Sequence, residues 1–196
     1  VVALDNVGFN VYKGKVNVLV GENGAGKSTL MKILSGVERQ SSGEIYLNNK
    51  KLNIFSTNDA EKNSIGIIHQ ELNLFPNLTV HENIFMGHEI LDRYKTIDTK
   101  QQIKITNELL SKLNQDIDSK TLVESLRIGQ QQIIEIAKAL AKKTKILIMD
   151  EPSSALSKKE VSVLFNVIEE LKKQEVTIIY ISHKLEEIIQ IGDVIT

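Results

Sequence analysis

Three glycines, a lysine and two hydroxyl side chains lie within one short stretch near the start of the chain, GENGAGKST at 21–29. The spacing Gly21-x-x-x-x-Gly26-Lys27-Ser28 fits the P-loop pattern, in which glycines let successive backbone N–H groups point at phosphate oxygens. A helix that begins directly after the glycines adds the partial positive charge of its N-terminus. The chemistry expected of this stretch is the binding of a phosphate chain.

The side chains of this stretch are expected to divide the work. Lys27 would reach the β and γ phosphates, and the Ser28 hydroxyl would bind Mg²⁺, whereas Thr29 would help to hold the α phosphate from the helix. The remaining positions contribute backbone groups, and they are Gly21, Glu22, Asn23, Gly24, Ala25 and Gly26. The alternative is a glycine turn that only links a strand to a helix. Because the pattern follows an apolar run and precedes a helical pattern, phosphate binding is favoured.

Two adjacent carboxylates, Asp150 and Glu151, follow the apolar run 146–149. A buried parallel strand ends at the edge where such sheets bind ligands, and alternate side chains of a strand point in opposite directions. We expect Asp150 to hold Mg²⁺, directly or through water, and Glu151 to be the general base that polarises the attacking water. Solvated carboxylates at a strand end are the alternative, and the P-loop pattern in the same chain favours the catalytic interpretation.

The elements that must position these residues have an α/β pattern. Four short runs rich in Ile and Val are continuous rather than alternating, which is typical of parallel strands covered on both faces. These runs are Val16–Val20, Ile65–Ile68, Ile146–Met149 and Thr177–Ile181. Helical patterns lie between them, one over Ser28–Leu34 that Gly36 ends and one after the capping box formed by Ser157 and Glu160.

Two further patterns complete the expected fold. The stretch 43–49 alternates weakly and ends in an Asn pair, which predicts a small antiparallel piece. After Pro76 two helical patterns, 103–113 and 130–141, lie without an obvious buried strand between them. The predicted fold class is therefore an α/β P-loop NTPase with a mostly parallel central sheet, a small antiparallel β piece and an inserted α-helical subdomain. Residues 1–72 and 144–196 are expected to form the nucleotide-binding core, and residues 73–143 the helical subdomain.

The composition of the chain narrows its possible partners. The formal net charge of the 196 residues is −1, which provides no bulk attraction to nucleic acid or anionic lipid. Cysteine is absent, which excludes disulfides, thiolate metal sites and a cysteine nucleophile. No apolar run approaches the ~18 residues of a membrane span, so work at a membrane would require a partner that crosses it. Both ends of the chain look cut, so we expect a fragment of a longer protein.

Three further segments accompany the P-loop pattern and the carboxylates. They are Gln70 after Ile67–His69, the run LRIGQQQ at 126–132, and His183 after Ile178–Ser182. Together, in this order and over nearly the whole chain, the five motifs resemble those of the ATP-binding cassette (ABC) ATPases. The resemblance implies that the chain binds ATP and Mg²⁺ and hydrolyses ATP to ADP and phosphate.

The resemblance also implies a role for each further segment. Gln70 is the Q-loop residue that contacts the metal and water and senses a membrane partner, and His183 is the switch histidine near the γ phosphate. The signature motif, which contacts ATP held by another cassette, consists of Leu126, Arg127, Ile128, Gly129 and Gln130. The D-loop consists of Ser154, Ala155, Leu156 and Ser157. Taken alone, a glycine before an amphipathic helix such as 130–141 is more often a simple cap.

Two positions depart from the pattern of the family. Arg127 stands where the signature usually carries a serine that touches the γ phosphate, and Ser157 stands where the D-loop commonly ends in aspartate. Arginine at the first position either contacts phosphate itself or points away. Ser157 is expected to serve chiefly as the cap of the following helix. The adenine-stacking aromatic residue of the family is expected before Val1, outside the fragment.

Within the family, the runs HQELNLFPNLTV at 69–80 and GQQQIIEIAKAL at 129–140 resemble the first cassette of bacterial tandem-cassette importers for monosaccharides such as ribose, galactose or xylose. This resemblance implies a second cassette in the same parent chain, transmembrane permease subunits and, through the permease, an extracytoplasmic sugar-binding protein. It places the protein at the cytoplasmic face of the cell membrane, without a nucleic-acid partner.

Several alternatives to sugar import stay open at this point. The first alternative is import of a nucleoside, with which the same motifs are compatible. A soluble ABC ATPase that acts on nucleic acid or ribosomes would be expected to carry a long coiled-coil insertion or a basic arm, and the chain has neither. A P-loop kinase has no use for the signature motif, and Glu151 with His183 argues against a cassette that only binds nucleotide.

Overall fold

The computed structural model describes residues 2–22 and 24–196 and divides into two compact units. The first unit consists of residues up to 67 together with 144–151 and 175–196. The second unit consists of residues 68–143 and 152–174, so the segment 152–174 groups with the helical region rather than with the sheet. The separate roles expected of the sheet core and the helical subdomain stay a prediction.

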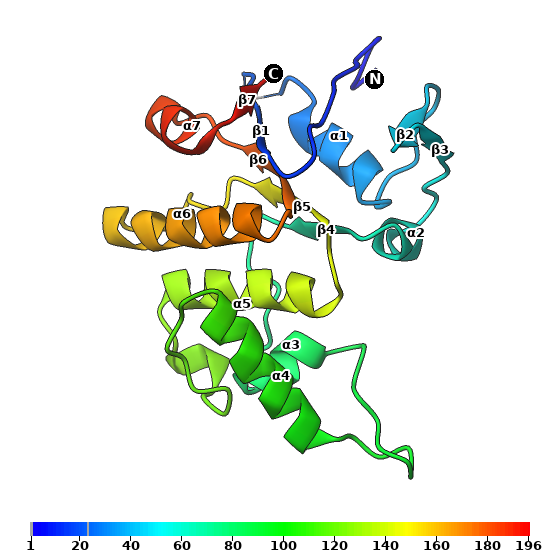
Figure 1. The fold of residues 1–196 in the computed structure, drawn as a ribbon. Coiled ribbons are helices and arrows are strands. Elements are labelled where there is room, and N and C mark those ends of the chain that lie inside the picture. The colour runs from blue at the N-terminus through cyan, green and yellow to red at the C-terminus, as the bar shows by residue number, and fades with distance from the viewer. Residues whose placement is uncertain (1, 23) are drawn as a thin grey trace. The chain divides into compact units, whose positions relative to one another are not determined.

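A parallel five-stranded sheet forms the centre of the first unit, with the strand order β4-β5-β6-β1-β7 (Figure 1). The strands are β1 (Val16–Leu19), β4 (Ile65–Ile68), β5 (Ile146–Asp150), β6 (Thr177–Ile181) and β7 (Val194–Ile195). Strand β6 pairs in parallel with β5 on one side and with β1 on the other, and β1 also pairs with β7. The predicted α/β class with a mostly parallel sheet is confirmed.

The apolar composition of the inner strands explains why they form. All five residues of β6 are buried, as are the three central residues of β5, so both faces of these strands are covered. A strand covered on both faces has no polar face, which is why these runs are continuous in the sequence. Ile148, Ile179 and Ile181 pack in one cluster with Met31 of the first helix.

The predicted antiparallel piece is a hairpin of β2 (Ile45–Leu47) and β3 (Lys50–Leu52). Its two turn residues, Asn48 and Asn49, have φ values of 51° and 62°. A two-residue turn with positive φ at both positions matches the right-handed twist of the strands, and Asn tolerates that conformation. The Asn pair in the sequence therefore marks the turn itself.

Three helices belong to the first unit, and they are α1 (Lys27–Leu34), α2 (Thr57–Lys62) and α7 (Leu185–Ile191). Helix α1 starts one residue before the predicted helix and ends where predicted. Gly36, just after it, has φ +75°, a conformation that side chains with a Cβ adopt rarely. Helix α2 begins at the N-cap Ser56, whose hydroxyl accepts a hydrogen bond from the Asp59 amide at 3.2 Å.

The second unit is helical. Its elements are α3 (Val80–Phe85), α4 (Thr99–Lys112), the short 3₁₀ helix η1 (Val123–Ser125), α5 (Ile128–Ala141) and α6 (Lys158–Lys173). Helix α5 packs against α3, α4 and α6. The inner residues Ile133, Ile134 and Ala137 of α5 are buried, as its helical periodicity predicts. Helix α5 covers the predicted pattern 130–141, and α4 covers the pattern 103–113 except for its last residue, Leu113, which is the C-cap.

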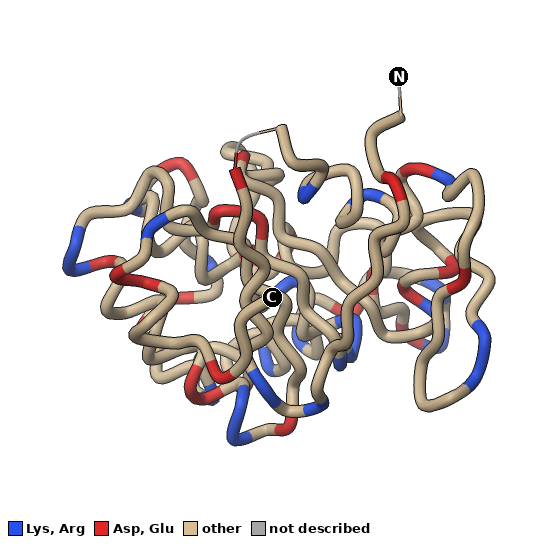
Figure 2. Tube along the Cα trace, turned by 90° about the horizontal axis from the view of Figure 1, so that it is seen from above, with Lys and Arg blue, Asp and Glu red and all other residues tan. Residues whose placement is uncertain are grey.

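Among the described residues, no helix is both long and apolar enough to cross a bilayer. Charged residues of both signs are interspersed along the chain trace (Figure 2). The 24 basic and 25 acidic residues thus nearly balance in number.

Candidate nucleotide site

The predicted phosphate loop connects β1 to α1. Gly24 and Gly26 have φ values of +84° and +92°, so the backbone turns through conformations that favour glycine. A Cβ on Gly26 would lie 2.6 Å from the Leu4 side chain and 2.8 Å from the Ala3 carbonyl oxygen. Both constraints require glycine at position 26. Asn23, also predicted to contact the nucleotide, lies outside the described residues.

Lys27 is the first residue of α1, and its side chain folds along the loop. Its Nζ donates hydrogen bonds to the Gly21 carbonyl at 2.6 Å and to the Glu22 carbonyl at 2.9 Å. These bonds hold the ammonium group at the loop, where phosphate oxygens are expected. A lysine bound to its own loop is pre-positioned, because fewer side-chain rotamers must be ordered when an anion binds.

Ser28 and Thr29 are the second and third residues of α1, and Ser28 is exposed. The first N–H groups of a helix have no partner within the helix and carry its positive partial charge. Before the helix, the Ala25 amide donates a hydrogen bond to the Glu22 carbonyl at 3.1 Å. The loop thus presents backbone donors and one hydroxyl at the end of a strand.

The two predicted carboxylates lie at the carboxyl end of β5. Asp150 is the last residue of β5 and lies in register with Ile181, the last residue of β6. Glu151 has φ 45°, in the left-handed region, and its amide donates to the Ile181 carbonyl at 3.1 Å. A residue other than glycine in this region carries strain that the surroundings must offset, and such residues cluster at functional sites.

Glu151 and His183 form the contact that most directly concerns catalysis. The Glu151 Oε1 atom lies 3.0 Å from His183 Nδ1, with 20% of the Glu151 side chain and 55% of the His183 side chain exposed. At this distance the carboxylate oxygen can accept a hydrogen bond from Nδ1 in the tautomer that carries the proton on this nitrogen. The structure therefore brings together two of the predicted catalytic residues from 32 positions apart.

The segment that carries His183 is held by a buried carboxylate that the sequence interpretation missed. Glu187 Oε2 accepts hydrogen bonds from the hydroxyls of Tyr180 at 2.9 Å and Ser182 at 3.1 Å. Ser182 Oγ in turn accepts from the Lys184 amide at 3.1 Å, so the backbone is pinned on both sides of His183. The available signal was a glutamate on the inner face of a short helix, next to Ile188, where an apolar residue is usual.

The oxygen donors present suit a magnesium ion. Ser28 offers a hydroxyl and Asp150 a carboxylate, and both belong to the first unit, in which α1 packs against β5. Mg²⁺ in phosphate sites is held by one or two protein oxygens, with phosphates and waters completing its shell. Accordingly, the described part of the chain forms no cluster of three or more His, Cys, Asp or Glu suited to a metal. Gln70, the third predicted ligand, is an exposed residue of the second unit that follows β4.

The predicted signature motif and D-loop both lie in the second unit. Helix α5 begins at Ile128 after the N-cap Arg127, whose amide donates to Gln130 Oε1 at 3.1 Å. Leu126 precedes the cap, and its carbonyl accepts from Gln131 Nε2 at 2.9 Å. The signature residues thus form the N-terminal turn of a helix, as the sequence predicts.

The D-loop residues Ser154, Ala155 and Ser157 are exposed and Leu156 is half-buried. Ser157 is the N-cap of α6, and its amide donates to Glu160 Oε2 at 2.9 Å. Glu160 Oε1 also accepts from the Gly129 amide at 3.1 Å. The end of the D-loop and the signature motif therefore share one carboxylate as a hydrogen-bond partner.

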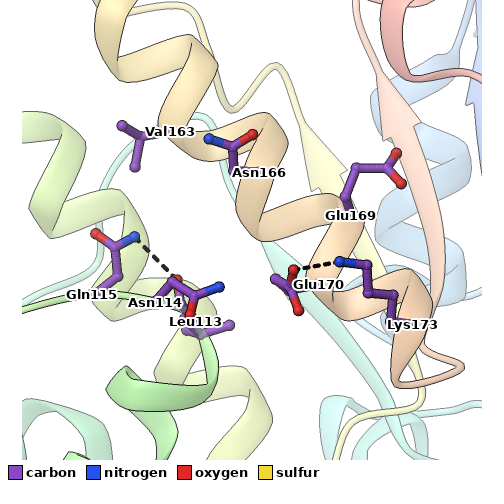
Figure 3. A pocket seen from close by; sticks show the side chains of 8 residues that line it. All are labelled: Leu113, Asn114, Gln115, Val163, Asn166, Glu169, Glu170 and Lys173. Atoms are coloured by element: carbon purple, nitrogen blue, oxygen red, sulfur yellow. Dashed lines mark hydrogen bonds and ion pairs between the residues drawn. The ribbon is translucent and has the colours of Figure 1, made fainter.

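A recess of about 370 Å³ in the second unit lies apart from these motifs (Figure 3). It opens between the residues that follow α4 and one side of α6, and an ion pair between Lys173 and Glu170 at 2.7 Å lies at its edge. The residues that line it are Leu113, Asn114, Gln115, Val163, Asn166, Glu169, Glu170 and Lys173. None of the residues predicted to contact a nucleotide belongs to this lining.

Known proteins resemble this chain over most of its length. Residues 4–154 match the family model described as ABC transporter. The chain is 49% identical over 190 residues to the ribose import ATP-binding protein RbsA of Caldanaerobacter subterraneus subsp. tengcongensis, which covers 97% of this chain and 38% of that protein. It is 47% identical over 196 residues to the xylose import ATP-binding protein XylG of Geobacillus kaustophilus, with 99% and 39% covered. The chain therefore spans less than half the length of these relatives.

Solved structures share the fold. A nucleotide-free ATP-binding cassette from an ABC transporter superimposes with a TM-score of 0.86 at 25% identity, over 97% of this chain and 79% of that one. A dimeric cassette in a post-hydrolysis state, bound to ADP and Pi, gives a TM-score of 0.76 at 27% identity, over 94% and 82%. With the fold, the phosphate loop and the family match in agreement, this chain belongs to the ABC transporter family.

Proposed function

We propose that the chain is the ATP-binding and ATP-hydrolysing part of an importer. The observation that carries the proposal is the arrangement of three adjacent parallel strands. Strands β1, β6 and β5 lie side by side, and their carboxyl ends lead into the phosphate loop, His183 and the Asp150-Glu151 pair, respectively. Parallel sheets bind ligands at the carboxyl ends of their strands. The same edge of this sheet would therefore carry the N–H groups that bind phosphate, the metal ligands and the general base.

The chain's own side chains would perform the hydrolysis as follows. Lys27 and the N–H groups of the loop would hold the phosphates, and Ser28 and Asp150 would hold a Mg²⁺ ion that supplies positive charge to the phosphate oxygens. Glu151 accepts a proton from the attacking water, while its hydrogen bond to His183 fixes the direction of the carboxylate. The water oxygen bonds to the γ phosphorus as the bond to the leaving ADP breaks. The signature motif of a second cassette would complete the site.

The names of the relatives support a monosaccharide as the transported substrate. Besides the ribose and xylose import proteins, the chain is 48% identical over 197 residues to the galactose/methyl galactoside import ATP-binding protein MglA of Clostridium tetani, with 99% of this chain and 39% of that protein covered. We infer that the full-length protein carries a second cassette, binds permease subunits at the cytoplasmic face of the membrane and works, through them, with an extracytoplasmic sugar-binding protein.

Replacement of Glu151 tests this proposal in the full-length protein. Glu151→Gln keeps the shape of the side chain and removes the base, so we expect hydrolysis to fall by about 100-fold or more, with ATP affinity within about twofold of wild type. Glu175→Gln is the matched control, because Glu175 is exposed in the same unit and pairs only with Lys13 among the ion pairs described. Unaltered ATP turnover in Glu151→Gln would show that Glu151 is not the general base.

The same preparation tests the importer. Purified from membranes through an affinity tag, the full-length protein should bring down a multispanning membrane protein. Recovery with ribosomes or DNA alone would instead place it among the soluble ABC ATPases that act on nucleic acid, the alternative that the sequence left open.

A further inference from the structure

Glu160 makes more contacts than a helix cap requires. It is the third residue of α6 and half-buried, and its Oε2 atom accepts hydrogen bonds from the Ser157 amide at 2.9 Å and the Ser157 hydroxyl at 2.7 Å. The bond from the Ser157 amide and the reciprocal bond from the Glu160 amide to the Ser157 hydroxyl, at 3.4 Å, form the capping box that the sequence predicts. The second oxygen, Oε1, lies 3.1 Å from the amide nitrogen of Gly129, which is 31 positions earlier in the chain.

Gly129 leaves room for this contact. A Cβ at position 129 would lie 2.7 Å from Glu160 Cγ and 2.8 Å from Oε1, distances that real Cβ atoms do not show. The glycine therefore allows α5 to approach the first turn of α6 closely enough for the hydrogen bond. Both residues belong to the second unit, which also holds the whole segment 152–174.

The Glu160 carboxylate accepts hydrogen bonds from backbone amides at the N-termini of two helices, α5 and α6. Gly129 and Glu160 both lie in first turns, where N–H groups lack partners within the helix and favour an anion. The Ser157 hydroxyl, the amides of Ser157 and Gly129, and the charge of Arg127 together hold the pKa of the Glu160 carboxyl below its usual value. Glu160 is therefore ionised at neutral pH.

We propose that Glu160 is a positioning residue that ties the signature motif to the end of the D-loop, so that the two segments move as one body. The proposal rests on the proposed function, because it concerns segments that are expected to face a second cassette. Glu160 does not touch nucleotide in this proposal. It sets the orientation of the N-terminal turn of α5 and of Arg127, which would contact the partner's ATP.

Ser157 gains a structural role from this tie. Aspartate is common at this position in the family. In this chain the residue is serine, and its hydroxyl donates a hydrogen bond to the Glu160 carboxylate. Arg127, which departs from the family's serine, contributes an opposite charge close to the same carboxylate. Both departures thus involve the group that links the two segments.

Amide hydrogen exchange of the full-length protein, without nucleotide, tests the tie itself. Glu160→Ala should speed exchange of the peptide covering 126–131 by about tenfold or more and leave the peptide covering 21–29 unchanged, because a lost hydrogen bond lowers protection locally. Glu160→Gln should stay within about threefold of wild type, since its amide oxygen still accepts from Gly129. Glu169→Ala, which removes an exposed partner of Lys172 on the same helix, is the control and should change neither peptide.

Steady-state kinetics of the same variants test the consequence. Glu160→Ala should lower kcat for ATP hydrolysis by about tenfold, with the Kd for ATP within about twofold of wild type, and Glu160→Gln should restore most of kcat. Unchanged exchange at 126–131, unchanged kcat, or faster exchange throughout the protein in Glu160→Ala would each overturn the proposal. A wild-type protein that hydrolyses no ATP would refute the proposed function instead, and the exchange data would still decide whether the tie exists.

Discussion

At the scale of single residues, Lys27 shows how a binding group is prepared before its ligand arrives. Its ammonium group bonds to two carbonyls of its own loop, Gly21 and Glu22, rather than to a carboxylate. Neutral carbonyls hold a cation without neutralising it, so the charge stays available to an anion. The spacing in the sequence identifies this residue, whereas the bonds that restrain it are visible only in the fold.

Lys27→Ala in the full-length protein should weaken ATP binding by about tenfold or more, because a charge-assisted contact to phosphate is lost. Titration with a fluorescent ATP analogue measures the Kd directly. Lys32→Ala is the matched control, since Lys32 lies on the same helix in an exposed ion pair with Glu38 at 3.3 Å and should leave the Kd within about twofold. Equal losses in the two variants would show that general charge, rather than the position of Lys27, determines affinity.

At the scale of elements, the close approach between the end of α1 and the start of α2 depends on Gly36. A Cβ there would overlap the backbone carbonyl of Ser56, and the residue also has positive φ. Gly43 has positive φ as well, +91°, but an added Cβ would meet nothing within 4 Å. Alanine at position 43 therefore tests the free-energy cost of the left-handed conformation alone. Alanine at position 36 tests that cost together with the cost of steric overlap.

Gly43→Ala should destabilise the protein by about 1 kcal/mol, the cost of the left-handed conformation. Gly36→Ala should cost more, about 3 kcal/mol, because the backbone at Ser56 must also move. The apparent midpoints of urea unfolding of the two full-length variants measure the difference. If both variants lose the same free energy of unfolding, the backbone at Ser56 moves away from the added Cβ without a measurable loss of stability.

The elements also show what sequence predicts well and what it does not. The four buried strands and helices α4 to α6 follow from local patterns, and the Asn pair predicts the hairpin turn because positive φ is a local property. Helix α3, only six residues long, was not predicted. Its amide groups at Val80 and His81 bond to the carbonyls of Thr121 and Ser119, some 40 residues away. Packing over such separations, like the bond between Gly129 and Glu160, leaves no local pattern.

The candidate site divides in the same way. Its residue types were evident from spacing in the phosphate loop and from the end of a buried strand. The pairing of Glu151 with His183 depends on β5 and β6 being neighbours, which no segment specifies alone. Glu187 was missed because a buried carboxylate at a helix face is recognisable only once its hydroxyl partners are known.

At the scale of the whole molecule, carboxylates that cap helices occur in both units. Asp59 bonds back to the N-cap residue of α2 in the first unit, and Glu82 and Glu160 bond back to the N-cap residues of α3 and α6 in the second. Hydrogen bonds from the hydroxyls of Ser56, Thr79 and Ser157, respectively, are the main cause that lowers the pKa of each carboxyl. Ionisation of these groups is thus coupled to folding.

A lowered folded pKa means that the stabilisation is present above the unfolded pKa of about 4 and is lost as the pH falls through the folded pKa. At about pH 6 the variant Glu82→Gln/Glu160→Gln should melt below wild type, and the difference should shrink as the pH falls through the folded pKa values of the two carboxyls, because the wild-type carboxylates are then protonated as well. Thermal melts of full-length wild type and variant across this range provide the measurement. A difference that does not vary with pH would mean that ionisation of the two caps does not contribute.

The position of β1 in the sheet has a consequence for how the protein is made. The strand that leads into the phosphate loop, β1, emerges from the ribosome long before its hydrogen-bonded neighbours in the sheet, β6 and β7, which begin at Thr177 and Val194. During synthesis β1 therefore cannot pair with these strands until more than 150 further residues have been translated. Contacts this distant in sequence form slowly, because the intervening chain must first lose its entropy. The phosphate loop therefore lacks the support of a complete sheet until β6 and β7 have been translated, and stable nucleotide binding is delayed until then.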